Sequence, residues 1–274
     1  MGTGAFIKKD QVDPRRAKGD IMGLASRWQA DIGRPPGCLI CGDMATVATH
    51  LMPQALVPHP EPSQLLSVGS VFERKIVMRP SGPVDHSILC RTHLDRILDL
   101  EAHAAELTLA SEDPDRDVRE AGFALAGADV DRLVRFAASV IWRYAVSSLP
   151  AAASVIDEQE PMLRAVVFAD APVAPDPETH IWKYRSKLTD LSTVALPPTR
   201  APLLKAIYWS FFVGGLGFFQ KADMPRMIPE KKVFRINGSN RHAFGYKDFD
   251  TAPETANLAA MMGIQLKAKA AKRR

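Results

Sequence analysis

The sequence has few of the features that define secreted or disulfide-rich proteins. Its 274 residues include three cysteines, an odd number, and two of them stand three positions apart. This spacing fits metal ligation in a reducing compartment better than a disulfide framework. The chain does not begin with a positively charged segment followed by an apolar stretch. We therefore expect no secretory signal and a cytoplasmic location.

Long apolar runs are also missing. The most apolar run, residues 206–219, is interrupted by three glycines and is shorter than the roughly 18 to 20 residues that a spanning helix needs. We expect no membrane segment. The sequence also lacks a phosphate-binding glycine loop and a nucleophile elbow, so no motif indicates an enzyme that acts on something other than nucleic acid.

What remains is an ordinary globular composition with an uneven distribution of charge. Apolar residues make up 46% of the chain, enough for a buried core, and the formal net charge is +4. Basic residues crowd the end of the chain: Lys267, Lys269, Lys272, Arg273 and Arg274. Such a tail either contacts phosphate or stays solvated.

Two pairs of candidate metal ligands stand out. Cys38 and Cys41 are separated by two residues, so both thiolates can face one ion. Cys90 and His93 stand three apart at the start of a predicted helix, where they share one face. The four residues predict one zinc site, with His50 or His86 as alternative fourth ligands. The other interpretation is that the thiols are ordinary buried cysteines.

A site of three thiolates and one imidazole leaves no coordination position open for water or substrate. Zinc held in this way contributes folding energy and does no chemistry. We therefore predict a structural Zn²⁺, and any catalysis must come from a second centre.

The arrangement of these motifs resembles a known group. The order Cys38-x-x-Cys41, Thr49-His50-Leu51-Met52-Pro53, then Cys90-Arg91-Thr92-His93 resembles the HNH-endonuclease-like treble-clef zinc-finger proteins of bacteria and phages. Residues 136–143 look like a segment that follows the finger in one uncharacterised branch. The resemblance covers roughly residues 35–145. It implies a treble-clef (ββα) zinc module.

The patterns along the chain predict an α+β protein in which helices surround this module and a smaller strand-rich part follows. Asp129 is expected to cap a helix, and the pair Gly214-Gly215 suits a hairpin turn. We expect five regions: a flexible arm (1–18), the zinc module (19–110), a helical region (111–171), a strand-rich region (172–260) and the basic tail (261–274).

The resemblance also implies an endonuclease that acts on DNA. In active members of the group a histidine acts as general base on water, and a divalent ion such as Mg²⁺ or Mn²⁺ stabilises the charge on the scissile phosphate. By motif position His50 would be that base. Thr49 and Leu94 stand where further metal ligands are common in the group. Their replacements would have to come from Asp85, Asp95 or His86.

The alternative is a non-catalytic zinc-finger protein that binds nucleic acid or a protein partner. In that case the His50 imidazole would form hydrogen bonds within the finger. Trp142 and Arg143, at the end of an apolar helix, are expected to pack and to extend their polar atoms to solvent. An aromatic cluster is expected to form the core of a sheet: Tyr208, Trp209, Phe211, Phe212, Phe218 and Phe219.

One basic stretch is a candidate for contacts with nucleic acid. It contains Lys231, Lys232, Arg235 and Arg241, with asparagine, glycine and serine between them. Arginine, asparagine and main-chain amides are common donors to phosphate. A solvated turn explains the stretch equally well.

Overall fold

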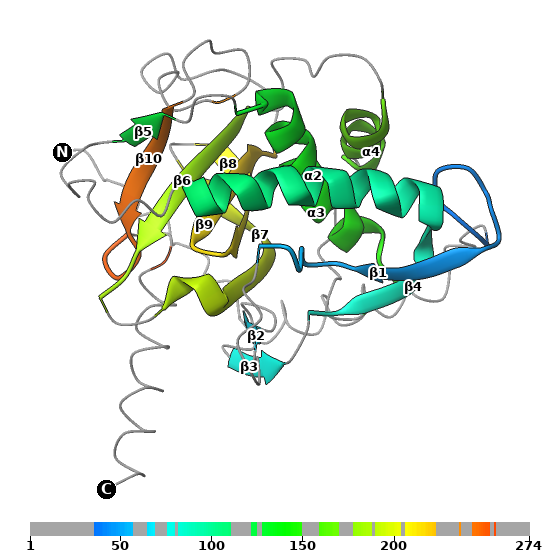
Figure 1. Cartoon of the computed structure of the whole chain (residues 1–274), viewed down its shortest axis with the longest axis horizontal. Coiled ribbons are helices and arrows are strands. Elements are labelled where there is room, and N and C mark those ends of the chain that lie inside the picture. The colour runs from blue at the N-terminus through cyan, green and yellow to red at the C-terminus, as the bar shows by residue number, and fades with distance from the viewer. Residues whose placement is uncertain are drawn as a thin grey trace, which may run out of the picture. The chain divides into compact units, whose positions relative to one another are not determined.

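The computed structural model describes a mixed α+β protein (Figure 1). The described residues are 36–56, 65–68, 76–79, 82–110, 122–124, 128–149, 159–169, 178–187, 190–203, 206–222, 236, 243–252 and 255. The expected arm, the basic tail and the basic stretch with Lys231, Lys232, Arg235 and Arg241 lie outside these residues.

A short ribbon and a helix form the part that carries the predicted metal ligands. Strands β1 (Thr46–His50) and β4 (Val84–Cys90) pair antiparallel, with His50 opposite Val84. Helix α2 (Arg91–Ala110) follows β4 directly. The helix that the sequence predicts at Cys90 is confirmed.

Helix α3 (Val130–Val146) begins where the sequence predicts. The Asp129 carboxylate accepts a hydrogen bond from the amide of Arg132 at 3.1 Å, which satisfies an N–H group at the start of the helix. Every residue from Phe136 to Ala145 is buried. Such burial on all sides matches the wide apolar stripe of the sequence.

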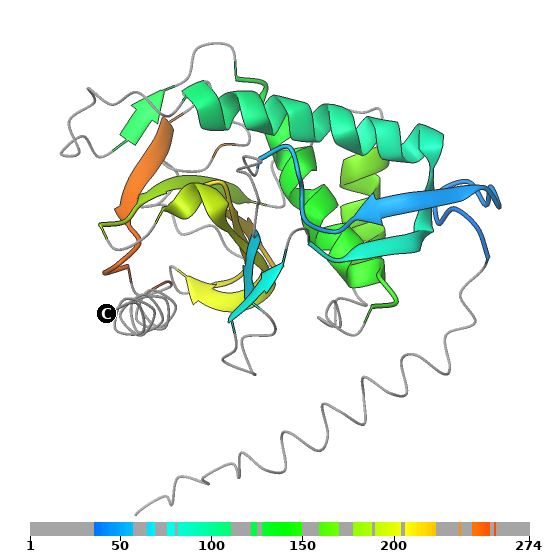
Figure 2. The ribbon, with the colours of Figure 1, turned by 60° about the horizontal axis from the view of Figure 1, so that its bottom comes forward.

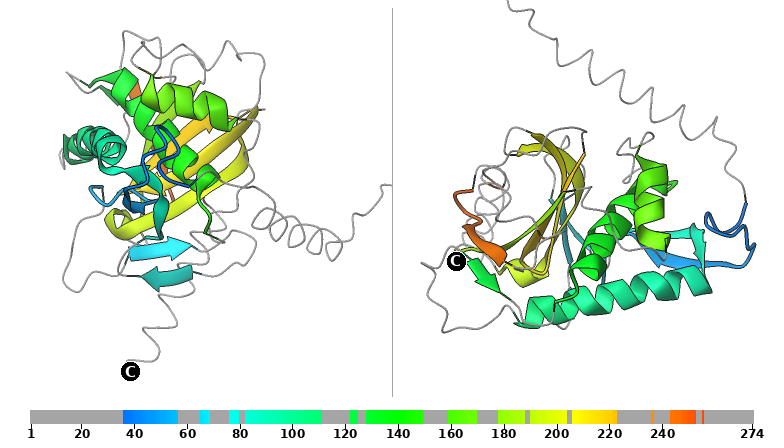
Figure 3. Two further views of the ribbon diagram at one scale, coloured as in Figure 1. Left: turned by 90° about the vertical axis from the view of Figure 1, so that its right-hand side faces the viewer. Right: turned by 90° about the horizontal axis from the view of Figure 1, so that it is seen from above.

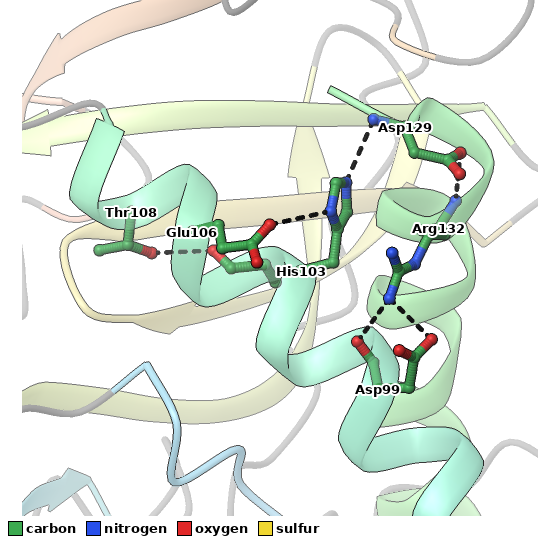
Figure 4. A network of polar contacts seen from close by, with 7 residues as sticks. Asp99, His103, Glu106, Thr108, Asp129 and Arg132 are labelled. Atoms are coloured by element: carbon green, nitrogen blue, oxygen red, sulfur yellow. Dashed lines mark hydrogen bonds and ion pairs between the residues drawn. The ribbon is translucent and has the colours of Figure 1, made fainter. Parts of the chain in front are cut away.

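Polar contacts join the start of α3 to α2 (Figure 4). Arg132 Nη2 lies 2.7 Å from Asp99 Oδ2 and donates to the Asp99 carbonyl at 2.9 Å. The amide of Asp129 donates to His103 Nε2 at 3.1 Å, and His103 Nδ1 lies 3.5 Å from Glu106 Oε2. The two helices are therefore tied together at both main-chain and side-chain atoms.

Helix α4 (Glu160–Phe168) lies beside α3 (Figure 3). Pro161 stands in its first turn, where a missing N–H costs nothing. Two arginines close its other end: Arg135 Nη1 donates to the carbonyl of Ala169 at 2.7 Å, and Arg96 Nη2 donates to the same oxygen at 3.2 Å. The carboxyl end of α4 is thus anchored to both α2 and α3.

An eight-stranded mixed sheet forms the rest of the described structure (Figure 2). Its order is β3-β2-β7-β8-β9-β6-β10-β5, parallel at β2–β7 and β6–β10 and antiparallel elsewhere. The strands are β2 (Leu65–Val68), β3 (Ile76–Arg79), β5 (Gly122–Ala124), β6 (Thr179–Arg185), β7 (Val194–Leu203), β8 (Ala206–Val213), β9 (Leu216–Lys221) and β10 (Ala243–Asp248). A 3-10 helix, η2 (Leu191–Thr193), precedes β7.

The sheet crosses the boundaries that the sequence predicts. Its strands β2 and β3 come from the region 19–110, and β5 comes from the region 111–171. The region 172–260 supplies the other five strands. The regions 19–110, 111–171 and 172–260 therefore all contribute strands to one sheet, whereas β1 and β4 form a separate ribbon.

The core runs from the β1–β4 ribbon through the helices to one face of this sheet. Phe136 of α3 meets Phe218 of β9, with ring centroids 5.1 Å apart. The other face of the sheet carries a second cluster, in which Tyr184 packs edge-on against Phe212 and Phe249. All six aromatic residues assigned to the core from the sequence are buried.

The turn between β8 and β9 is the predicted glycine turn. Gly214 and Gly215 have φ angles of +58° and +74°, in the left-handed region that glycine tolerates. Among the described residues, no helix is long and apolar enough to cross a membrane.

Candidate metal centre

The first pair of ligands stands on a tight turn. The amide of Cys38 donates to the carbonyl of Asp43 at 2.7 Å, and the amide of Gly42 donates to the carbonyl of Cys38 at 2.8 Å. Gly42 has a φ of +77°. Gly37 has a φ of +95°, and a Cβ there would lie 2.8 Å from the carbonyl oxygens of Gly42 and Asp43. Glycine is therefore required on geometric grounds at Gly37.

The second pair stands where the ribbon meets α2. Cys90 is the last residue of β4, and His93 lies in the first turn of α2. The amide of Leu39 donates to the carbonyl of Ile88 at 2.9 Å, which brings the turn of the first pair against β4. Residues far apart in the sequence therefore meet at one point.

The four side chains converge. Their ligand atoms all lie within 4.8 Å of one another. The Sγ atoms of Cys41 and Cys90 are 3.8 Å apart, and His93 Nδ1 lies 3.6 Å from Cys38 Sγ and 3.2 Å from Cys90 Sγ. Ligands of a tetrahedral zinc ion, with Zn–S bonds of about 2.3 Å, stand about 3.8 Å apart for two sulfurs and about 3.6 Å for sulfur and nitrogen. The distances from Cys41 Sγ to Cys90 Sγ and from Cys38 Sγ to His93 Nδ1 match this geometry, and the distance from Cys90 Sγ to His93 Nδ1 is shorter.

The electrostatics of the cluster also suit a cation. Burial raises the pKa of Cys38, but hydrogen bonds from the main chain of Cys90, Ile40 and Cys41 outweigh it and lower the pKa. Burial and then the charge of Arg96 lower the pKa of His93, which favours the neutral ring that binds metal. None of the three cysteines forms a disulfide.

The pKa of Cys41 is raised. A main-chain hydrogen bond at Asp43 lowers it, but desolvation and the neighbouring sulfurs of Cys38 and Cys90 together outweigh that effect. Three thiolates at these distances repel one another. A divalent cation between them removes the repulsion.

His93 is the histidine that lies with the three cysteines, and neither alternative histidine joins the cluster. His86 is exposed on β4, and His50 ends β1. Within the part of the chain that the structure describes, this cluster is the one group of three or more cysteine, histidine or acidic side chains that could hold a metal ion.

His50, the predicted general base, is partly exposed. Its Nδ1 atom is buried and has no hydrogen-bond partner among the described residues. Burial lowers the pKa of His50; the negative charge of Glu101 opposes this, and the positive charge of Arg143 adds to it. The lowered pKa favours the neutral form of the ring, which is the form that can accept a proton.

The two carboxylates considered as Mg²⁺ ligands, Asp85 and Asp95, have other contacts. Both oxygens of the Asp85 carboxylate are engaged: Oδ1 accepts from the amide and hydroxyl of Ser87, and Oδ2 accepts from Ser147 and Ser148. Asp95 pairs with Arg91 on the exposed face of α2 at 3.6 Å. The hydrogen bonds of Asp85 therefore connect β4 to the end of α3.

The two residues that depart from the HNH-like pattern, Thr49 and Leu94, are buried and contribute to packing. Thr49 is fully buried, and its hydroxyl donates to the carbonyl of Val47 at 3.2 Å. Leu94, in the first turn of α2, is buried in the core.

The expectation that Arg143 extends to solvent is wrong. Arg143 is 1% exposed, and its Nη1 atom lies 2.7 Å from Glu101 Oε1 and donates to the carbonyl of His50 at 2.6 Å. Trp142 packs as expected, and its indole N–H donates to Glu160 Oε1 at 2.8 Å. The signal for the ion pair was Glu101 itself, a charged residue on the apolar face of α2 that needs a buried cation beside it.

No family model, no curated protein and no solved structure matches this chain.

Proposed function

We propose that this chain is a treble-clef protein of the HNH-like group, that its four-ligand site holds one structural zinc ion, and that it binds nucleic acid without cutting it. The observation that carries the proposal is the convergence of Cys38, Cys41, Cys90 and His93 on a turn, an antiparallel ribbon and a helix. That order of elements is what the resemblance implies.

Zinc suits this ligand set on chemical grounds. Three thiolates and an imidazole are soft and borderline ligands, which Zn²⁺ prefers and Mg²⁺ does not. With all four positions taken by protein, the ion would fix the turn, the ribbon and the first turn of α2 to one another. The zinc thus supports the surface around it.

Binding without cleavage is favoured by the surroundings of His50. A phosphodiester hydrolase of this type needs a divalent ion next to its base. Asp85 has both carboxylate oxygens occupied, and no described group of three or more metal ligands includes His50. The described residues thus offer a base and no ligand set for a catalytic ion.

The exposed face of α2 does not suit phosphate. It carries Asp95, Asp99 and Glu106 against Arg91. Contacts with the backbone of nucleic acid are therefore assigned to the basic stretch named from the sequence: Lys231, Lys232, Arg235 and Arg241.

The experiment is binding of fluorescently labelled duplex DNA at a series of salt concentrations. Each phosphate contact contributes a slope of about −0.9 in a plot of log affinity against log salt. We expect replacement of the four basic residues by alanine to flatten this slope, while Arg164→Ala on the exposed side of α4 leaves it unchanged. An absence of DNA binding at low salt by the zinc-loaded protein would overturn the proposal.

A second candidate, endonuclease activity, is favoured by the neutral and partly exposed ring of His50. The test is nicking of supercoiled plasmid with added Mg²⁺ or Mn²⁺ by wild type and His50→Ala, with His86→Ala as the control. Nicking that is lost only in His50→Ala would establish cleavage. No nicking by zinc-loaded wild type would leave binding as the function.

A further inference from the structure

Three elements of the structure meet at Arg143. The residue belongs to α3, its ion-pair partner Glu101 belongs to α2, and the carbonyl to which it donates belongs to His50, the last residue of β1. A further hydrogen bond runs from Arg143 Nε to the carbonyl of Ser139, one turn back in α3, at 3.3 Å. The guanidinium is thereby held against its own helix.

The charges of Arg143 and Glu101 destabilise the folded protein when they are buried, unless each has a partner of opposite charge. Arg143 is 1% exposed and Glu101 is 2% exposed. Removing an ion from water costs several kcal/mol, and only close geometry offsets this. An apolar residue would fill the same space without this desolvation cost. In this structure the guanidinium of Arg143 is compensated by Glu101 Oε1 and by the carbonyls of His50 and Ser139.

The contacted group is the main chain of His50. Its carbonyl accepts from Arg143, and the next amide, that of Leu51, donates to the carbonyl of Pro83 at 3.0 Å. The side chains that follow, Leu51 and Met52, are buried. The backbone at His50 is thus fixed on both sides, whereas Nδ1 of its ring has no described hydrogen-bond partner.

We infer that Arg143 is a positioning residue for His50: together with Glu101 it fixes the end of β1 so that the imidazole is presented to a ligand beside the zinc-binding ribbon. The inference rests on the proposed function for the kind of ligand, a nucleic-acid phosphate. The placement of the ring is independent of any ligand. Glu101 and Arg143 are the charged groups that act on the ring, from α2 and α3 respectively.

The experiment is a proton–carbon NMR titration of the His50 ring in the full-length, zinc-loaded protein, with the resonance assigned by its loss in His50→Gln. Glu101→Gln removes the charge that favours the imidazolium, so the titration midpoint of His50 falls. Arg143→Lys keeps the charge but loses the planar donor geometry, so the ring resonance of His50 moves and broadens.

Arg135→Lys is the matched control. Arg135 stands on the same helix and also donates to main-chain carbonyls, but these belong to α4. It should leave the His50 titration unchanged. The inference is overturned if Glu101→Gln and Arg143→Lys, both folded with one zinc, give the wild-type His50 curve. If Arg143→Lys does not fold, the main-chain amide shifts of His50 and Leu51 in Glu101→Gln decide: a change shows that the end of β1 has moved, and wild-type shifts overturn the inference.

The DNA titration separates this inference from the proposed function. Altered His50 titration in a protein that binds no DNA would keep Arg143 as a positioning residue and remove nucleic acid as the ligand. DNA binding by wild type, with a His50 titration that the variants do not alter, would keep nucleic acid as the ligand and remove Arg143 as a positioning residue.

Discussion

The α-carbon of Gly214 packs against the carbonyl oxygen of Leu56, so closely that a Cβ at residue 214 would overlap that oxygen. The same Cβ would lie 3.5 Å from Thr108 Cγ2 near the end of α2. The turn between β8 and β9 therefore lies against the segment after β1 and near the helix that carries His93. The part of the chain that carries the candidate metal ligands lies close to the large sheet at this glycine.

The first prediction compares Gly214→Ala with its neighbour Gly215→Ala. Both residues have positive φ, which costs an alanine about 1 kcal/mol. At Gly215 the nearest atom to a new Cβ, Lys183 Nζ, is 3.5 Å away, an ordinary contact. We expect Gly214→Ala to reduce the free energy of unfolding by about 1–3 kcal/mol more than Gly215→Ala, because main chain must move. Equal losses in urea unfolding would contradict the contact with Leu56.

The second prediction concerns the stability that Asp85 contributes. Burial would raise the pKa of its carboxyl, but hydrogen bonds from Ser87, Ser147 and Ser148 outweigh burial and lower the pKa below the ordinary value of 3.8. A group with a lowered pKa in the folded state stabilises the protein above its unfolded pKa. That stability is lost as the pH falls through the folded pKa.

We therefore expect Asp85→Asn to reduce the free energy of unfolding by about 1–3 kcal/mol at pH 7. The difference from wild type should shrink as the pH falls below about 4. Urea unfolding at several pH values measures this difference, and effects of acid on the metal site cancel because both proteins carry it. Asp95→Asn, on the exposed face of α2, should behave as wild type. A pH-independent loss in Asp85→Asn would show that the charge of the carboxylate does not matter.

The third prediction separates the shape of the α3 cap from its charge. Asp129→Ala removes the acceptor for the Arg132 amide and should cost about 1 kcal/mol in thermal or chemical unfolding. Asp129→Asn keeps an acceptor of the same shape and should retain most of that stability. If both variants lose the same amount, the charge of Asp129 at the helix start, and not the hydrogen bond, is what stabilises α3.

Local signals predicted much of this molecule. The spacing of Cys38 and Cys41 and of Cys90 and His93 was enough to group the ligands, because each pair lies on one turn of main chain. Asp129 predicted the start of α3 for the same reason, since a cap acts on the next three residues. The choice of His93 over His50 and His86 followed from pair spacing, and His93 is the histidine that lies with the three cysteines in the structure.

Contacts between distant residues were beyond these signals. The parallel pairing of β2 with β7 places Leu66 opposite Val194, and nothing local to either strand specifies its partner. The partner of Arg143 is likewise on another helix. The general tendency of arginine to reach solvent therefore gave the wrong expectation, because a buried carboxylate overrides it.

The most direct test of the account is X-ray absorption at the zinc edge of the purified protein, with metal content measured on the same sample. The account predicts one zinc per chain, with three sulfur neighbours at about 2.3 Å and one nitrogen at about 2.0 Å. Cys90→Ser should lose a sulfur neighbour or the metal, and His86→Ala should match wild type. A folded protein without zinc, or zinc bound only by nitrogen and oxygen, would contradict it.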